Sequence, residues 1–209
     1  MIIALLGPPG TGKGTYAQML QDEFKIKKIV TGDLCRNEKA KGTKLGKEIA
    51  SYIDKGNLVP SNIIIKLIEK NLEGVNDAVL DGFPRSVEQA ELFKGKLDKV
   101  YYINSSDEVA VERLGGRRTC RKCNRIYHIK NNPSKVEGKC DFCNGELYVR
   151  EDETEEVIKE RLREYKKQTA PVIEFYRKKG ILAEINGDRF FKEVYKDIRK
   201  LYKELRENK

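Results

Sequence analysis

The first two dozen residues constrain the fold more than any other part of the chain. The apolar run IIALL at 2–6 ends at a glycine-rich loop, GPPGTGKGT at 7–15. A helical spacing of apolar residues follows from Tyr16 through Phe24, which places Tyr16 on the apolar face of a helix. A continuous apolar run of this kind is typical of a strand buried on both faces. The loop fits the pattern G-x-x-x-x-G-K, in which backbone N–H groups, a helix N-terminus and the ammonium group of Lys13 bind phosphate. The segment therefore predicts a buried strand, a phosphate-binding loop and a helix.

Three later apolar runs, at 78–80, 100–103 and 181–185, are each followed by the start of a helical pattern. Alternating strands and helices predict a parallel sheet covered by helices, with ligands bound beyond the carboxyl ends of the strands. Two stretches interrupt the alternation: 32–60 is mostly helical in pattern, and 115–152 is rich in Cys, Gly, Asn and basic residues. We expect both to be inserts on one core, since 209 residues suffice for a single substantial core.

The net charge of +9 is concentrated in the second of these stretches. Residues 117–150 hold nine Lys or Arg and three acidic residues, which predicts binding of a polyanion, either nucleic acid or a nucleotide polyphosphate. No apolar run approaches the roughly 20 residues that cross a bilayer, and the apolar start leads into the glycine loop rather than into a signal-peptide pattern. We expect a cytoplasmic protein with no membrane partner.

The phosphate loop departs from its usual form at position 14, which is Gly rather than the Ser or Thr that binds Mg²⁺ directly. A hydroxyl group comes one residue later, at Thr15, and Asp81 follows the apolar run at 78–80. We therefore expect Thr15 and Asp81 to hold the water shell of Mg²⁺ rather than the ion itself.

Four of the five cysteines form the pattern C-x₂-C-x₁₆-C-x₂-C, made by Cys120, Cys123, Cys140 and Cys143. Two such knuckles can place four thiolates around Zn²⁺. Two disulfides among these cysteines are disfavoured in a cytosolic chain. An iron–sulfur cluster, or an Fe or Co ion in place of Zn²⁺, stays an alternative. Four protein ligands leave no open position, so the pattern favours a structural Zn²⁺ that folds its segment. Cys35 stands apart and is interpreted as a small buried side chain.

Arg161 lies on the apolar stripe of a helix predicted to begin after Thr154, a favourable N-cap residue. An arginine on such a stripe either extends to the surface or points into a charged cleft, and the spacing fits both. Ser86 and Gln89 fit a capping box, which gives Gln89 a structural role. The glycines at 115–116 fit either a helix stop or a hinge.

Taken in order, six motifs resemble those of the zinc-bearing, long-lid adenylate kinases, a family of nucleoside monophosphate kinases. They are GPPGTGKGT at 7–15, TGDLCR at 31–36, LDGFPRSVEQA at 80–90, LGGRR at 114–118, YHIKNNPSKVEGKCDFC at 127–143 and ERLREYKKQTAP at 160–171. The resemblance implies a three-layer α/β/α fold of the P-loop NTPase type, with a five-stranded parallel sheet. It also implies a core of residues 1–30, 60–116 and 153–209, a monophosphate-binding insert of residues 31–59 and a zinc-binding lid of residues 117–152.

The activity that the resemblance implies is reversible transfer of the γ-phosphoryl group of Mg-ATP to AMP, by a monomer that has no nucleic-acid partner. The residues implied around the transferred group are Lys13, Arg85, Arg117, Arg150 and Arg161. Those implied for ATP are Gly10, Thr11, Gly12, Lys13, Gly14, Thr15, Arg113, Arg117, Tyr127, His128 and Gly187. Those implied for AMP are Thr31, Gly32, Arg36, Leu58, Val59, Gly82, Arg85, Gln89, Arg150 and Arg161. The carboxylate of Asp152 would order the arginines of the lid by ion pairing.

Other functions remain open at this point. A UMP/CMP kinase would share the fold, but that subfamily typically has Ala where this chain has Thr31, and a GTP-dependent AMP kinase is a second relative. The basic surface, the cysteine knuckles and the aromatic residues Tyr127 and Tyr148 would suit a nucleic-acid-binding module, although that function leaves the phosphate loop unexplained. A nucleotide sensor with little turnover is a further alternative, against which the full set of arginines argues.

Overall fold

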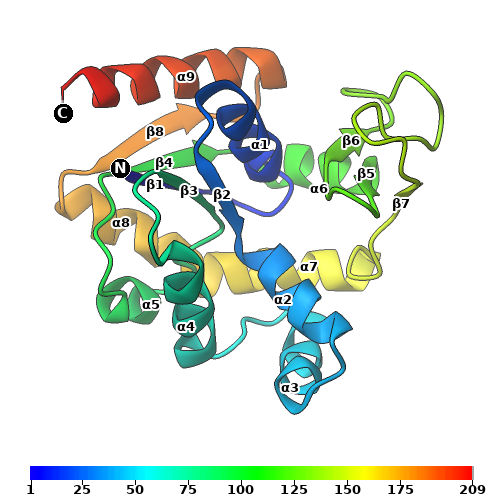
Figure 1. Cartoon of the computed structure of the whole chain (residues 1–209), viewed down its shortest axis with the longest axis horizontal. Helices are drawn as coiled ribbons and strands as arrows, with labels where there is room; N and C mark the ends of the chain where they lie inside the picture. The colour runs from blue at the N-terminus through cyan, green and yellow to red at the C-terminus, as the bar shows by residue number, and fades with distance from the viewer. Residues whose placement is uncertain (209) are drawn as a thin grey trace.

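A five-stranded parallel sheet forms the centre of the computed structural model, which describes residues 1–208 (Figure 1). Its strands, in the order β2-β3-β1-β4-β8, are β1 (Ile2–Leu6), β2 (Lys27–Val30), β3 (Ala78–Asp81), β4 (Lys99–Asn104) and β8 (Leu182–Asn186). All four pairings are parallel, and β1 lies between β3 and β4. The apolar run at the start of the chain is therefore the middle strand. The predicted α/β fold with five parallel strands is confirmed.

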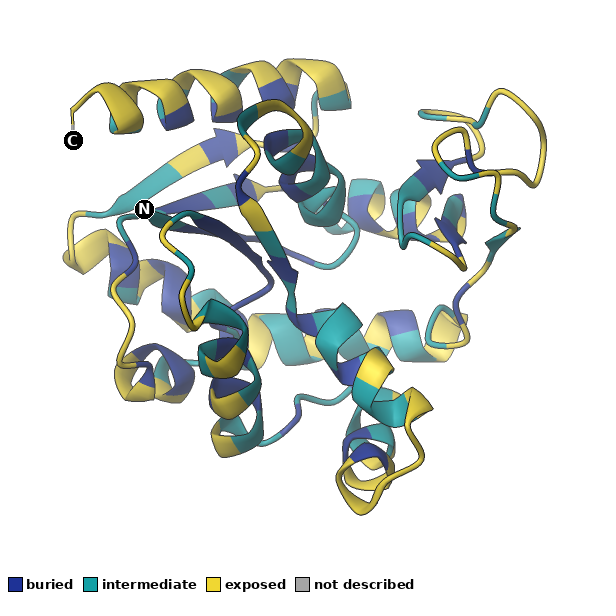
Figure 2. Cartoon of the chain, viewed as in Figure 1, coloured by how far each residue is buried: buried dark blue, intermediate teal, exposed yellow. Residues whose placement is uncertain are grey.

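Helices cover both faces of this sheet. One face carries α1 (Lys13–Phe24) and α9 (Phe191–Glu207), and the other carries α4 (Ser61–Leu72), α5 (Val87–Leu92) and α8 (Ala170–Lys178) (Figure 1). Successive residues of a strand point to opposite faces. Ile3 and Leu5 therefore pack with α1 and α9, whereas Ala4 and Leu6 pack with the opposite layer. Buried residues accordingly gather on the strands and on the inward sides of the helices (Figure 2).

The carboxyl ends of three neighbouring strands place three functional segments side by side. In the register of the sheet Leu5 pairs with Asp81, and Asp81 pairs with Val30. The phosphate loop follows β1, Asp81 ends β3, and α2 (Thr31–Ala40) begins directly after β2. The edge of the sheet therefore brings the glycine loop, a carboxylate and the start of a helix together, as open parallel sheets do at their ligand sites.

The segment between β2 and α4 consists of α2 and α3 (Lys44–Ile53). Thr43 caps α3, because its hydroxyl oxygen accepts a hydrogen bond from the N–H of Gly46. Gly46 also allows the two helices to pack closely, since a Cβ at this position would lie 2.3 Å from the carbonyl oxygen of Glu38. The expectation that this stretch is helical is confirmed.

Residues 117–152, which the resemblance predicts to be a lid and which we call the lid segment, follow α6 (Asp107–Gly115) and contain a small antiparallel sheet in the order β6-β5-β7. Its strands are β5 (Arg117–Cys120), β6 (Ile126–His128) and β7 (Leu147–Tyr148). The chain then returns through α7 (Glu155–Glu164), a single π-turn (Tyr165–Thr169) and α8. The predicted N-cap at Thr154 is confirmed, because its hydroxyl accepts a hydrogen bond from the N–H of Val157. Across residues 1–208 no helix is long and apolar enough to span a membrane.

Candidate active site

The phosphate loop connects β1 to α1 and holds its own lysine folded against it. The Nζ of Lys13 donates hydrogen bonds to the carbonyl oxygens of Gly7, at 2.9 Å, and Pro8, at 2.7 Å. Gly10 and Gly12 both have φ +91°, a left-handed backbone that disfavours other residues. Burial lowers the pKa of Lys13 to about 7; Asp81 raises it, and Arg85, Arg161 and Arg117 lower it further.

Two cavities meet beside this loop. The large cavity is lined by the loop, by residues of the lid and by α1, and the small cavity is lined by α2 and the loop before α4. Three arginines, Arg36, Arg85 and Arg161, line both cavities. The predicted residues that line the large cavity are Gly10, Gly12, Lys13, Gly14, Thr15, Gly32, Arg36, Leu58, Asp81, Gly82, Arg85, Arg113, Arg117, Tyr127, His128, Arg150 and Arg161. Those that line the small cavity are Thr31, Gly32, Arg36, Leu58, Val59, Arg85, Gln89, Asp152 and Arg161.

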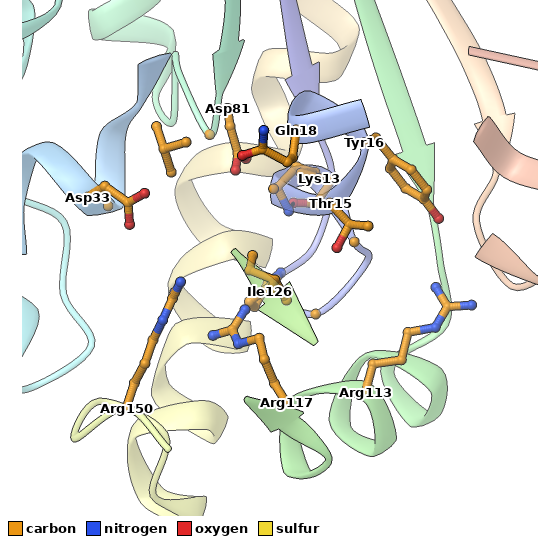
Figure 3. Close-up of a pocket in the computed structure, with 18 of the residues that line it drawn as sticks. Lys13, Thr15, Tyr16, Gln18, Asp33, Asp81, Arg113, Arg117, Ile126 and Arg150 are labelled. Carbon is orange, nitrogen blue, oxygen red and sulfur yellow. Dashed lines mark hydrogen bonds between the residues drawn. The ribbon is translucent and has the colours of Figure 1, made fainter. Parts of the chain in front are cut away.

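The arginines come from distant parts of the chain and crowd one another. Arg117 and Arg150, from the two ends of the lid segment, point up toward the phosphate loop and Asp33 (Figure 3). Burial lowers the pKa of Arg161. Burial also lowers the pKa of Arg117 well below its usual value, and the positive charges of Arg150 and Arg161 lower it further. Arg85 lines the same cavity, and its pKa is lowered by burial and by Arg161. Such a cluster of like charges creates a site that an anion would stabilise.

Two carboxylates balance part of this positive charge. The Oδ2 of Asp152 lies 3.6 Å from Nη1 of Arg36 and 3.7 Å from Nη1 of Arg161. Burial opposes ionisation of Asp152, but Arg161 and Arg36 outweigh it and lower the pKa. Glu153, whose side chain is 1% exposed, forms an ion pair with Arg117. Asp152 thus links α2 to α7 through arginines outside residues 117–152, so the predicted pairing of Asp152 with arginines of the lid stays a prediction.

Thr15, Asp81 and Asp33 all bring oxygen atoms to the lining of the large cavity, with Asp81 drawn between the other two (Figure 3). The Oδ2 of Asp81 lies beside the start of α1, because a Cβ on Gly14 would be 3.1 Å from it. Burial raises the pKa of Asp81, and Lys13 and Arg85 oppose that shift. Hydroxyl and carboxylate oxygens are the donors that Mg²⁺ prefers, so these residues fit the predicted metal environment. Asp33 was not predicted, although it lies in the quoted motif TGDLCR.

The far side of the large cavity carries flat polar groups. The guanidinium group of Arg113 donates to the carbonyl oxygens of Gly187, at 2.8 Å, and Arg189, at 3.0 Å. The Nδ1 of His128 accepts hydrogen bonds from the backbone N–H groups of residues 130 and 131, both at 3.1 Å. Nδ1 therefore carries no proton, and burial lowers the pKa of His128. Tyr16 and Phe191 also line this side; the sequence pattern had placed Tyr16 on a helix face, and Phe191 was not singled out.

Two predicted nucleotide-binding residues lie outside the cavity linings that the structure describes. Thr11 is fully buried, and its hydroxyl donates to the carbonyl oxygen of Pro8 at 3.0 Å. Gly187 contributes its carbonyl group to Arg113. Both residues therefore support their neighbours, Thr11 within the phosphate loop and Gly187 behind Arg113.

The small cavity contains eight of the ten residues predicted for AMP; the other two, Gly82 and Arg150, line the large cavity alone. Residues of the small cavity that were not predicted for AMP include Cys35, Ile53, Gly56, Asn57 and Ile64. The hydroxyl of Thr31 donates to the carbonyl oxygen of Asp81 at 3.2 Å, so its lone pairs remain for another donor. The backbone N–H of Gln89 donates to the hydroxyl oxygen of Ser86, which confirms the predicted cap. Its side-chain Oε1 accepts from the N–H of Arg85 at 2.8 Å. Ser86 is therefore the N-cap residue as predicted, whereas the side chain of Gln89 holds Arg85 rather than the N–H of Ser86 and also lines the small cavity.

The four predicted metal ligands gather in the lid. Their sulfur atoms all lie within 4.8 Å of one another, with Sγ–Sγ distances of 3.4 Å for Cys120–Cys143 and 3.6 Å for Cys123–Cys140. A tetrahedral site with metal–sulfur bonds of about 2.3 Å would separate its sulfurs by roughly 3.8 Å, so the group fits a metal ion.

The two cysteine knuckles have matching backbones, in which the N–H of Asn124 donates to the Cys120 carbonyl oxygen and that of Asn144 donates to the Cys140 carbonyl oxygen. The hydroxyl of Tyr127 lies 3.4 Å from the Sγ of Cys140. Because the ring of Tyr127 also lines the large cavity, this residue connects the cysteine group to that cavity.

The lid contacts the core through ion pairs. Arg125 donates from both terminal nitrogens to the carboxylate of Asp22 on α1, at 2.8 Å and 3.0 Å. The side chain of Ile126 meets the start of the same helix, where a Cβ on Gly14 would lie 2.7 Å from its Cδ1. The lid segment therefore contacts α1 beside the phosphate loop and contributes residues to the lining of the large cavity.

Comparison with known proteins agrees with this geometry. The family model described as adenylate kinase matches residues 5–181. Proteins named adenylate kinase are similar over nearly their whole length: that of Methanothrix thermoacetophila is 48% identical, with 96% of this chain and 98% of the relative covered. That of Archaeoglobus fulgidus is 41% identical, with 99% and 100% covered, and that of Clostridium botulinum strain Hall is 46% identical, with 95% and 96% covered. With its phosphate loop, its arginine cluster and this similarity along almost the entire sequence, the chain belongs to the adenylate kinase family.

Proposed function

We infer that this member of the adenylate kinase family transfers the γ-phosphoryl group of Mg-ATP to AMP, reversibly, with ATP in the large cavity and AMP in the small one. The observation that carries this assignment is the shared wall of Arg36, Arg85 and Arg161. A phosphate loop lies on one side of that wall and a separate cavity lies on the other. Two phosphate-bearing ligands bound in these cavities would meet end to end at the arginines, which is the arrangement that phosphoryl transfer needs.

The residues of the wall supply charge and position rather than a base. The second pKa of a phosphate monoester is roughly 6, so the acceptor is mostly a dianion at neutral pH and needs no proton removed. His128 is the single histidine of the chain, and it lies on the far side of the large cavity, against Gly116. Guanidinium groups bind phosphate oxygens through two parallel hydrogen bonds and keep their charge even where burial lowers their pKa. Arg85, Arg117, Arg150 and Arg161 would thus stabilise the charge of the transferred group.

Lys13 would move when ATP binds. Its ammonium group now donates to two backbone carbonyls of the loop, and we expect it to turn to the phosphates, whose charge attracts it more strongly. Thr15, Asp33 and Asp81 would hold the water shell of Mg²⁺. When bound, Mg²⁺ neutralises charge on the phosphates of ATP.

The adenine rings of ATP and AMP would bind in different surroundings. Arg113 is fixed by two carbonyls, so its flat face is available to stack on the adenine of ATP, with the ring of His128 nearby. Thr31 and Gln89 offer polar groups to the adenine of AMP, between the apolar side chains of Leu58 and Val59. A hydroxyl at position 31 supports AMP over UMP or CMP as the acceptor.

We propose that residues 117–152 act as a lid that Zn²⁺ folds, and that residues 31–59 act as the mobile AMP-binding insert. The apolar cluster of the lid contains Tyr127, Leu147 and the cysteines, too small a set to fold the segment without a metal. Closing of the lid excludes water from the phosphates and so prevents hydrolysis of ATP. We expect a cytoplasmic monomer, because both cavities are built within one chain.

The distribution of charge in the lid argues against nucleic acid as the partner. Arg117 and Arg150 face the large cavity, and Arg125 pairs with Asp22. Arg121 pairs with Glu146. Four of the nine basic residues that the sequence concentrates in 117–150 therefore face the cavity or pair with an acidic residue, which favours a nucleotide polyphosphate.

The test is a coupled assay for ADP with Mg²⁺ and a panel of nucleotides. We expect ATP and AMP to give ADP with the highest kcat/KM, and GTP as donor or UMP and CMP as acceptors to give much lower values. Preference for UMP or CMP would overturn the acceptor assignment. Absence of ADP formation, together with tight binding of RNA or DNA at low salt, would support the nucleic-acid-binding alternative.

We predict that ATP binding takes up a proton above pH 7. Burial lowers the pKa of Lys13 to about 7 in the free protein, so at pH 8 its amine is largely neutral. A bound polyphosphate raises that pKa, and Lys13 then gains a proton from solution. The measurement is calorimetric titration at pH 8 in two buffers of different ionisation enthalpy. The observed enthalpy should differ between buffers for the parent protein and should not differ for Lys13→Met; equal enthalpies for both proteins would contradict the prediction.

A further inference from the structure

The helix that returns from the lid contains one irregular turn. Residues 155–178 are helical throughout, but Tyr165–Thr169 form a π-turn in which the N–H of Ala170 donates to the carbonyl oxygen of Tyr165. Pro171 is the next residue. In a regular α-helix its N–H would donate to the carbonyl of residue 167, but proline has no N–H, and its ring would clash with that carbonyl. Single π-turns inside α-helices are rare and occur frequently at functional sites. This one forms part of the wall of the large cavity, to which Tyr165 and Thr169 both contribute.

The extra residue of the π-turn changes which side chains share a face. In a regular α-helix, residues 161 and 169 would be separated by about 800° of rotation, or about 80° beyond two full turns. A π-turn holds one more residue per turn and removes roughly 100° of that rotation, so the two positions come within roughly 20° of each other. Arg161 and Thr169 therefore face the same cavity from one helix, as the structure shows.

Thr169 uses this position to hold the backbone of Arg85. Its hydroxyl donates to the carbonyl oxygen of Arg85 at 2.7 Å, across 84 residues of sequence, and Thr169 is 6% exposed. Arg85 lies in the irregular segment between β3 and α5, which has no strand partner to fix it. Two further hydrogen bonds hold the same residue, from its N–H to Gln89 and from its Nε to the Gly82 carbonyl oxygen, both at 2.8 Å.

We propose that Thr169 is a positioning residue for Arg85, and that the π-turn places it there without turning Arg161 out of the cavity. The inference rests on the proposed function, in which Arg85 binds the phosphate of AMP. The hydroxyl of Thr169 fixes the carbonyl end of Arg85 while Gln89 fixes its amide end. The direction of the guanidinium group toward the shared wall then depends on a helix that begins at the end of the lid.

The test is a double-mutant cycle read by equilibrium binding of AMP. Thr169→Val keeps the shape of the side chain and removes the donor, and Thr169→Ser keeps the donor. We expect Thr169→Val to raise the Kd for AMP about tenfold, Thr169→Ser to stay within about twofold of the parent, and the Kd for ATP to change less than about twofold in both. In an Arg85→Ala background, Thr169→Val should add no further loss of AMP binding, because the group that it positions is gone.

The outcomes distinguish failure of the positioning role of Thr169 from failure of the proposed function. If Arg85→Ala weakens AMP binding and Thr169→Val in the parent protein does not, Thr169 has no positioning role and the proposed function stands. Equal losses from Thr169→Val in the parent and in the Arg85→Ala background would also overturn the inference, since the hydroxyl would then act by another route. If Arg85→Ala itself leaves AMP binding unchanged, the phosphate role of Arg85 is wrong and the inference falls with it. Weakening of ATP and AMP binding to the same degree by Thr169→Val would indicate general loss of structure and overturn the positioning role.

Discussion

Replacing Lys13 with Met should lower the rate of ADP formation at least about a thousandfold. Methionine fills similar space without charge, so the γ-phosphoryl group would lose the one ammonium group that the phosphate loop itself supplies. The fold should tolerate the change, because burial already disfavours the charged form of Lys13 and a neutral side chain removes that cost. We therefore expect an unfolding temperature equal to or above that of the parent protein. Steady-state kinetics and thermal unfolding measure the two effects separately.

A matched control keeps this experiment specific. Lys66 is exposed on α4 and lines neither cavity, so Lys66→Met should retain the activity of the parent. Lys13 does not line the small cavity, and the Kd for AMP should therefore stay within about twofold in Lys13→Met. Near-normal turnover in Lys13→Met would show that the loop does not act on the transferred phosphate.

Elements with strong apolar patterns could be predicted from the sequence, and the edge strand could not. The strands β1, β3, β4 and β8 correspond to the apolar runs of the sequence. The strand β2 has the sequence KKIV and begins with two lysines, and it is held by pairing with β3 at the edge of the sheet rather than by a pattern of its own. Pairing with a neighbouring strand is a tertiary effect that a local pattern does not contain. The three strands of the lid, two to four residues long, are too short to have a period.

Some residues of the candidate site could likewise be predicted from the sequence, and others could not. Motifs identified Lys13 and the cysteines, because these residue types at fixed spacing serve one kind of chemistry. The spacing of Arg161 fitted both a surface and a cleft, and only packing of α7 against α6 through Ile158 and Leu162 directs Arg161 to the cavity. The π-turn has no signature in the apolar pattern, and Pro171 was its one local signal. Tyr16 was assigned to a helix face because the apolar period of α1 does not distinguish a core contact from a cavity wall.

Loss of the cysteine group should unfold the lid and leave the core intact. The double variant Cys120→Ser, Cys143→Ser removes one ligand from each knuckle, and we expect bound Zn²⁺ to fall from about one per chain to none. Binding of a structural Zn²⁺ contributes about 10–16 kcal/mol to the folding of small zinc domains, and the lid has little apolar cluster to replace that contribution. The core is built on two separate apolar clusters that contain none of the lid residues. Unfolding should therefore take two steps, with the lid melting first.

Metal analysis, limited proteolysis of residues 117–152 and thermal unfolding together measure this outcome. Cys35→Ser is the matched control, because Cys35 is a buried residue of α2 that packs in an apolar cluster of the core and lies outside the group of four sulfur atoms. It should keep its metal and its resistance to proteolysis. At temperatures between the two steps, the double variant should lose turnover, since Arg117 and Arg150 belong to the lid. It should keep AMP binding, because every residue of the small cavity except Asp152 comes from the insert or the core. Unchanged metal content and unchanged protection of the lid in the double variant would show that the four thiolates do not hold a structural ion.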